Sequence, residues 1–382
     1  MPLGPVSKPR NDEALQVPSP KSQVPSLPFL RREWVPAAVW GLCLLAALGY
    51  GFFSVGRYDG GPGITIILAQ NNTDPWKGAL ADYRRDFYTL RRLSDEALAG
   101  AGAEKPALVV WPETAFVPSV YWHSTYRDNP ASWALVKELL DYLSANTVPF
   151  LIGNDDARKE VSESGKWERV SRNGVLFFER GKVTGRYHKM RLVPFSEHFP
   201  YRKRFPWVYD FLARSDTHFW QRGDTAVVFS ARLPTSAGER DVRFSTPVCF
   251  EDGFGGISRD FTRNGADIII NLSNDAWSGS LAAQMQHLSV AVFRAVENRR
   301  SLARATASGQ TCGIAPDGRI VAMAAPFCEA ALTVTLPLRA ETTVYTRAGD
   351  FFPLVCIGAA LFLLTFSFGF GILKRTLWQD QT

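Results

Sequence analysis

The sequence predicts a layered α/β domain carried between two membrane-spanning helices. Two stretches without a charged residue, 34–55 and 351–373, are long enough to cross a bilayer, which takes about 20 apolar residues as a helix. Between them, short apolar runs alternate with segments whose apolar residues recur at three and four positions. Such an alternation of strands and helices is typical of layered α/β packing.

A polar tail precedes the first apolar stretch. Residues 1–33 are rich in proline, serine and charge and show no periodicity, so we expect them to be disordered. The stretch at 34–55 is too long, and starts too far along the chain, for a cleavable signal peptide. No small-residue cleavage site follows it, so we interpret it as a membrane span.

Basic residues set the predicted orientation of both spans. Five of them precede the first span, and Lys374 and Arg375 follow the second. Because cytoplasmic flanks carry the excess of lysine and arginine, the tails 1–33 and 374–382 are predicted to be cytoplasmic. Residues 60–345 then lie on the opposite side of the membrane and form the working domain.

The predicted elements follow the first span in regular order. After a glycine-rich turn, the apolar run at 64–69 is typical of a buried strand, and spacing of three and four predicts a helix over 75–100. The two patterns then repeat, and a hairpin turns at Arg180 and Gly181. These later elements are a strand at 107–113, a helix at 130–146, a strand at 148–153 and the hairpin at 174–189.

The second half of the domain repeats the alternation. Its elements are strands within 241–251, a helix at 256–266, a strand at 267–274, a long helix at 282–300 and strands within 301–325. The last strands form a hairpin with Asp317 and Gly318 at its turn. No glycine-rich phosphate loop is visible, so the sequence gives no support for nucleotide chemistry.

Charge and cysteine content narrow the class of partner. The net charge of +6 comes from scattered residues rather than one basic stripe, which favours anionic lipid head groups over nucleic acid. The five histidines lack metal-ligand spacing, so we expect no metal and no cofactor. Cys249, Cys312 and Cys328 lie outside the spans, and at least one of these thiols is free. A disulfide between Cys312 and Cys328 is an alternative, but we expect the hairpin between them to pair other residues.

Polar residues follow several apolar strands and together form a chemically complete set. Each has an ordinary explanation on its own, because strand ends meet solvent. A cysteine attacks a carbonyl as the thiolate, so it needs a base for its proton and a cation for the developing anion. Glu113 offers the base, Lys189 the cation and Cys249 the nucleophile. Glu197 and Glu251 are further carboxylates that can orient the lysine or relay protons.

Five motifs carry a resemblance to a known family. "WPETA", "YHKMRLVPFSEHFP", "CFE", "NLSNDAWSG" and "YTRAGDFFPL" resemble motifs of the nitrilase, or carbon–nitrogen hydrolase, superfamily. Within it they are most similar to the apolipoprotein N-acyltransferase family, and the resemblance covers residues 60–373. It implies a four-layer αββα sandwich that faces the periplasm from the bacterial inner membrane.

The resemblance also implies a reaction and a role for each site residue. Cys249 would take an acyl chain from a phospholipid, and the α-amino group of a diacylglyceryl cysteine on a lipoprotein would attack the resulting thioester. Glu113 is then the base, and Lys189 stabilises the oxyanion. Glu197 is a second essential carboxylate, and Glu251 supports the nucleophile. Residues implied near the substrate are Trp76, Phe250, Asn274 and Trp277.

Two departures from the family pattern keep other functions open. Family members carry several more membrane helices before the domain, and Ser278 stands where they usually have an aromatic residue. The chain can therefore work with a separate multi-span subunit, act as a minimal acyltransferase, or have another role. The competing class is a membrane-tethered amidase or nitrilase that uses water on a small amide, because both reactions pass through the same thioester. A third alternative is a catalytically silent scaffold.

The predicted orientation is testable in spheroplasts. A membrane-impermeant thiol probe should label a cysteine introduced within 155–170, because that segment is predicted to be periplasmic. It should not label a cysteine introduced within 5–25, and the chain without an added cysteine gives the background. Labelling of only the second position would contradict the orientation.

Overall fold

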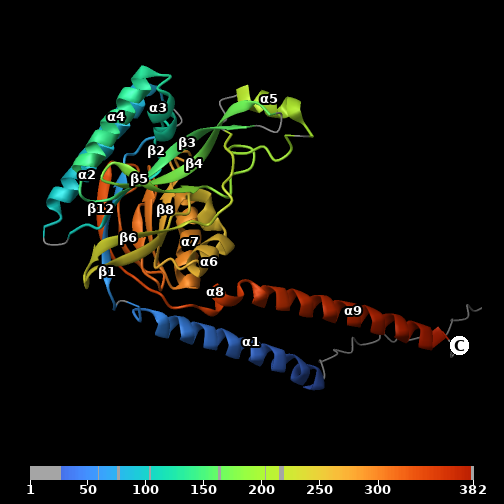
Figure 1. Ribbon diagram of the computed structural model, residues 1–382. Helices are drawn as coiled ribbons and strands as arrows, with labels where there is room; N and C mark the ends of the chain where they lie inside the picture. The colour runs from blue at the N-terminus through green and yellow to red at the C-terminus, as the bar shows by residue number, and fades with distance from the viewer. Residues whose placement is uncertain are drawn as a thin grey trace, which may run out of the picture. The chain divides into compact units, whose positions relative to one another are not determined.

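The chain divides into two units between Ser54 and Val55, and each is described by itself. The computed structural model describes residues 27–58, 60–74, 78–102, 105–161, 165–202, 204–214 and 219–379. Their helices and strands are drawn in Figure 1. The first unit contains α1 (Leu27–Ser54), in which Pro36–Ser54 is apolar and long enough to cross a membrane. This helix coincides with the span predicted at 34–55.

The ends of the two apolar helices differ from the predicted boundaries. Helix α1 begins at Leu27, inside the predicted disordered tail, because leucine, arginine and glutamate favour helix beyond the apolar stretch. Residues 1–26 lie outside the described residues. The second predicted span falls in α9 (Phe351–Gln379), which also runs into the predicted tail 374–382. Among the described side chains its apolar part is Phe351–Phe366, which is shorter than a membrane span.

The second unit contains two six-stranded sheets. The first has the order β12 (Ala330–Pro337), β1 (Gly63–Gln70), β2 (Leu108–Phe116), β3 (Phe150–Val161), β4 (Trp167–Glu179) and β5 (Lys182–His188). Its strands β1, β2 and β3 are parallel. A parallel pair needs a crossover connection, which α2 (Leu80–Gly100) provides first, followed by α3 (Val120–Tyr126) and α4 (Pro130–Ala145).

The second sheet is built in the same way. Its order is β11 (Ile320–Met323), β10 (Cys312–Ile314), β9 (Ser301–Thr306), β8 (Ile268–Ser273), β7 (Gly238–Ser245) and β6 (Val228–Thr235). Strands β7, β8 and β9 are parallel. The first crossover contains the short helix η1 (Cys249–Gly253) and α6 (Gly255–Arg263), and the second contains α7 (Leu281–Asn298).

Alternate side chains of each sheet build different cores. Ile66 and Leu68 lie in the core shared with the second sheet, whereas Ile67 lies in the core formed with α2 and α4. In the second sheet, Ile269 packs against Leu288 of α7. Because strand side chains alternate between faces, each sheet is covered by the other sheet on one face and by helices on the other. The predicted layered α/β fold is confirmed, and its layers follow the order helix, sheet, sheet, helix (Figure 1).

Both predicted hairpins are present. Arg180 and Gly181 have φ of 48° and 73°, the left-handed pair that a two-residue hairpin turn requires. Cys312 pairs with Met323 between β10 and β11, and both Cys312 and Cys328 are free thiols. The alternative disulfide between them is therefore wrong.

One predicted strand and three short helices differ from the predictions. The strand predicted within 241–251 ends at Ser245, and Cys249 starts η1 instead of continuing the strand. The short helices α3, α5 (Pro206–Arg214) and α8 (Val344–Ala348) were not predicted, because each is too short to show a helical period.

Candidate active site

Glu113 projects from an irregularity in β2. The pairing of β2 with β3 runs to Trp111 and Ile152 and resumes only at Phe116 and Asn154, so residues 112–115 bulge out. Proline at position 112 has no N–H for the ladder, and Thr114 has a φ of 50°. The carboxylate of Glu113 is consequently directed away from the regular ladder, yet it stays buried.

The bulge requires glycine on the neighbouring strand. A Cβ atom on Gly153 would lie 2.3 Å from the carbonyl oxygen of Pro112 and 2.4 Å from the amide nitrogen of Thr114. These are backbone atoms on both sides of Glu113, so no side-chain rotation relieves the overlap. Gly153 is therefore what allows β3 to approach the bulge closely.

Lys189 follows β5 directly and is the buried cation of the site. Its side chain is 0% exposed, and Nζ donates hydrogen bonds to Glu113 Oε1 at 3.0 Å and to Glu197 Oε1 at 2.7 Å. Burial alone would lower the pKa of Lys189, but the charges of these two carboxylates outweigh it and raise the pKa well above its usual range. The lysine therefore remains an ammonium ion throughout the neutral pH range.

Each carboxylate that binds Lys189 has a second partner. Asn173 donates a hydrogen bond from Nδ2 to Glu113 Oε1 at 2.7 Å, and the amide of Val193 donates to Glu197 Oε2 at 2.9 Å. Burial and the charge of Glu113 raise the pKa of Glu197, and the attraction of Lys189 opposes that rise. The two carboxylates are thus held against one ammonium group.

Cys249 lies at the first position of η1 in a left-handed backbone conformation. Its φ is 47°, which a residue other than glycine adopts only when its surroundings hold it there. Burial and the negative charge of Glu113 raise the pKa of the thiol well above its usual range, against the attraction of Lys189. The resting thiol is therefore protonated and needs a base before it can attack.

Glu251 joins the Cys249 turn to the segment after Lys189. It is fully buried, and it accepts hydrogen bonds from the amides of Val248, Met190 and Arg191 at 2.8, 2.7 and 3.0 Å. The hydroxyl of Tyr187 donates to both of its oxygens, at 2.9 and 2.7 Å. A carboxylate with so many donors is a structural tie between two segments.

Three of the four residues predicted near the substrate are described. Phe250 and Trp277 are exposed, the latter by 66%, while Asn274 is buried and accepts a hydrogen bond from the amide of Ala276 at 3.1 Å. Asn274 therefore shapes the loop that presents Trp277. Trp76 lies outside the described residues.

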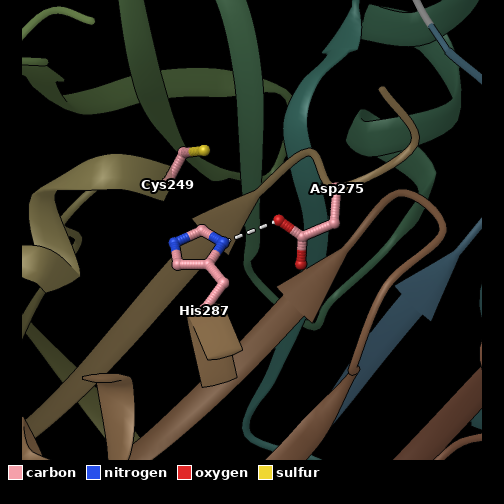
Figure 2. A group of neighbouring side chains, drawn as sticks. All are labelled: Cys249, Asp275 and His287. Atoms are coloured by element: carbon pink, nitrogen blue, oxygen red, sulfur yellow. Dashed lines mark hydrogen bonds and ion pairs between the residues drawn. The ribbon is translucent and has the colours of Figure 1, made fainter. Parts of the chain in front are cut away.

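Sequence reasoning missed a second charged group beside the thiol. Asp252 of η1, Asp275 after β8, His287 of α7 and Arg304 of β9 form a network of ion pairs. Figure 2 shows one ring nitrogen of His287 turned toward Asp275, with Cys249 beside them. A charge within the buried strand "SLARAT" was the signal in the sequence, since a buried arginine requires a carboxylate partner.

Cys249, Asp275 and His287 also offer one potential metal-ligand atom each, all within 4.8 Å of one another. Both nitrogens of His287 already contact carboxylates, Nδ1 at 2.8 Å from Asp275 and Nε2 at 2.9 Å from Asp252. Burial opposes a charge on the ring, but these hydrogen bonds raise the pKa of His287 to about 9. An imidazolium has no lone pair for a metal, so this group fits an ion-pair network better than a resident metal.

The chain is similar to proteins of a known family. Residues 69–344 match the family model for carbon–nitrogen hydrolase. Apolipoprotein N-acyltransferase 1 of Treponema pallidum (strain Nichols) is 45% identical over 342 residues, which cover 87% of this chain and 60% of that protein. Apolipoprotein N-acyltransferase 1 of Treponema denticola is 42% identical, with 91% of this chain and 64% of that protein covered. The chain thus spans less than two thirds of the length of these two relatives.

Among solved structures, an amidase from Nesterenkonia sp. is similar. It is 18% identical in sequence, with a TM-score of 0.49, and the match covers 77% of this chain and 96% of the amidase.

The close approach at Gly153 yields a stability prediction. Gly153→Ala should lower the free energy of unfolding by about 1–3 kcal/mol, because the new methyl group overlaps fixed backbone atoms. Thermal unfolding in detergent measures the change. Gly100→Ala is the control, since no atom lies within 4 Å of the Cβ position there. Equal midpoints for Gly153→Ala and the unmodified chain would show that β3 does not need glycine at the bulge.

Proposed function

Because the chain belongs to the carbon–nitrogen hydrolase family, we propose that its site carries out acyl transfer in the form that its relatives' names state, the N-acylation of apolipoproteins. One observation carries this proposal. The buried ammonium of Lys189 contacts both Glu113 and Glu197, and its charge acts on the Cys249 thiol. A base, a cation and a nucleophile are thereby available in one buried site.

In the first half-reaction the thiol of Cys249 attacks the ester carbonyl of a phospholipid. Its proton passes to Glu113 as the S–C bond forms, because the raised pKa of the thiol leaves little free thiolate. The proton then moves to the departing glycerol oxygen as the C–O bond breaks. A lysophospholipid leaves, and the acyl chain remains on Cys249 as a thioester.

In the second half-reaction an amine attacks the thioester. The acceptor is the α-amino group of a diacylglyceryl cysteine at the start of a lipoprotein. Glu113 accepts a proton from the attacking amine and returns it to the sulfur as the C–S bond breaks, and an amide is released. The attacking group is the neutral amine, and removal of this one proton by the carboxylate as the N–C bond forms prevents the nitrogen from leaving again.

Lys189 stabilises the negative oxygen of both tetrahedral intermediates. Its ammonium is already in place and excluded from water, so it needs no reorganisation when charge develops. Glu197 holds the ammonium from the second side, and Glu251 keeps the Cys249 turn in register with the segment after Lys189.

Substrate contacts are proposed for the residues around the Cys249 turn. Phe250 and Trp277 offer exposed aromatic surface, which suits acyl chains, and Asn274 supports the loop of Trp277. Trp76 is included on the basis of its motif. No cofactor or metal takes part in the proposed chemistry.

We place the domain on the periplasmic face of a bacterial inner membrane. The apolar length of Pro36–Ser54 supports one span, and the apolar start of α9 together with residues up to 373 supports a second. Basic residues before the first span and after the second support cytoplasmic ends. Residues 60–345 would then work at the surface of the outer leaflet.

Exposed aromatic residues around α5 support contact with lipid. Tyr201, Phe205, Trp207 and Phe211 are all exposed, and arginines at 202 and 204 lie among them. Aromatic rings beside basic groups suit the boundary between head groups and acyl chains. We include a separate multi-span membrane subunit in the proposal, as a partner that would help to enclose the site where the two lipid substrates meet.

Trapping of the thioester tests the nucleophile. Incubation with phospholipid should leave an acyl group on Cys249 that hydroxylamine removes, as observed by intact-protein mass spectrometry. Cys249→Ser should abolish the hydroxylamine-sensitive adduct, because an alcohol is a far weaker nucleophile near neutral pH. Cys328→Ser is the control and should retain it. An adduct located on Cys312 or Cys328 would refute the assignment.

The fate of the thioester separates acyl transfer from hydrolysis. The acylated chain should persist in bilayers until a diacylglyceryl peptide with a free N-terminal cysteine is added, and then yield an N-acyl peptide. The measurement is mass spectrometry of the products, with and without a candidate multi-span subunit. Fatty acid released at one rate with or without peptide, and no N-acyl peptide, would favour the water-using hydrolase.

A further inference from the structure

A buried network of four charged residues lies on the side of Cys249 that the proposed reaction does not use. We call it the charge clamp, and it consists of Asp252, Asp275, His287 and Arg304. Asp252, Asp275 and Arg304 are almost completely buried, and the side chain of His287 is 18% exposed. Two carboxyl groups of the clamp face one guanidinium and one imidazole ring.

His287 is the member that joins two segments. Its Nε2 contacts Asp252 Oδ1 at 2.9 Å, and Asp252 belongs to the same short helix as Cys249. Its Nδ1 contacts Asp275 Oδ1 at 2.8 Å, and Asp275 lies in the loop that carries Trp277. One imidazolium ring therefore ties the nucleophile turn to the loop at the proposed substrate entrance.

The other clamp contacts fix the ring and its partners. Arg304 donates from Nη1 to Asp275 Oδ2 at 2.9 Å, and its Nε lies 3.6 Å from Asp252 Oδ2. Its Nη2 lies 2.9 Å from His287 Nδ1, the nitrogen that also faces Asp275. A Cβ atom on Gly309 would lie 2.4 Å from Asp275 Oδ2, so the chain packs directly against this carboxylate. Arg294, which lies on the same helix as His287, donates a hydrogen bond to the backbone carbonyl of Asp252 at 3.3 Å.

Cys249 depends on this arrangement for both conformation and charge. Its left-handed backbone is unfavourable for an L-residue, so contacts within the turn must hold it. The charge of Asp275 opposes ionisation of the thiol, and His287 and Arg304 are the cations that balance Asp275. Loss of one of these cations leaves a negative charge facing the sulfur.

We propose that His287 is a positioning residue, which as a cation bridges Asp252 and Asp275 and thereby sets the placement and the reactivity of the Cys249 thiol. The proposal rests on the proposed function in taking Cys249 as the nucleophile. It adds a residue that touches neither the base Glu113 nor the cation Lys189 in any described contact.

The bridging state has a defined pH range. The groups that face His287 are Asp252 and Cys249 from η1, Asp275 from the loop after β8 and Arg304 from β9. Cys312 of β10 interacts electrostatically with Arg304 and with Asp275. Because the folded pKa of His287 lies above the ordinary value of about 6.5, its stabilisation is complete below that value. It is lost as the pH rises through about 9.

Alkylation of Cys249 by iodoacetamide tests the clamp without any lipid. The full chain in detergent is alkylated over a range of pH, and the rate is read at Cys249 by peptide mass spectrometry. His287→Gln removes the cation, so the pH midpoint of alkylation should rise by about one unit, a tenfold slower reaction at neutral pH. His123→Gln is the matched control, because His123 is also buried and paired with a carboxylate, Asp128, but belongs to α3.

A second variant keeps the test decisive if His287→Gln does not fold. Asp275→Asn removes the negative charge that opposes ionisation, so the midpoint should fall. Opposite shifts in these two variants, or a fall in Asp275→Asn alone when His287→Gln is unfolded, support the clamp. An unchanged midpoint in a folded His287→Gln chain overturns it, as does an unchanged midpoint in Asp275→Asn. The alkylation assay contains no acyl donor, so its outcome does not depend on acyl transfer. The expected shifts, together with no acyl transfer in the separate acylation assays, would uphold the clamp and reject the proposed function.

Discussion

The domain is organised around one ammonium group that has no contact with water. A buried lysine charge is costly unless carboxylates in good geometry compensate it, and Lys189 has two, Glu113 and Glu197. The first comes from a bulge in β2, an interior strand, and the second from the segment that follows β5, the edge strand, so the cation holds two separate parts of the first sheet together. Both carboxylates also accept a hydrogen bond from a neutral donor, Glu113 at Oε1 from Asn173 and Glu197 at Oε2 from the amide of Val193.

Cys249 lies in η1, which follows β7 of the second sheet, and two ties fix its turn. Glu251 accepts amide hydrogen bonds from Val248 on one side and from Met190 and Arg191 on the other. Asp252, the next residue, ties the same turn through His287 to the loop after β8. The two adjacent carboxylates in "CFED", Glu251 and Asp252, therefore tie the turn to two different parts of the domain. The strained turn is held before any substrate binds, which is the property that a preorganised site needs.

Apolar periodicity was sufficient for most of the strands and for the two hairpins, because it is a local signal, although β6 and β12 were not predicted. Polar strand ends singled out Glu113 and Lys189, which the structure brings into contact. Other features depend on contacts between distant segments. His287 resembles any polar residue on an amphipathic helix, and Arg304 finds Asp275 only because β8 and β9 lie side by side. The change from strand to η1 at Cys249 was likewise invisible, since nothing local marks its left-handed φ.

The bulge around Glu113 also determines which face of the sheet each later residue of β2 occupies. The strand spends four residues, 112–115, where β3 has Gly153 alone, and the difference of three is odd. Successive residues of a strand point to opposite faces of the sheet, so an odd number of extra residues places the side chains that follow on the other face. Trp111 and Phe116, which an unbroken strand would place on opposite faces, both enter the core with α2 and α4. The length of "WPETA" is thus constrained by parity: a gain or loss of one residue would turn Phe116 out of its core even if the carboxylate were kept.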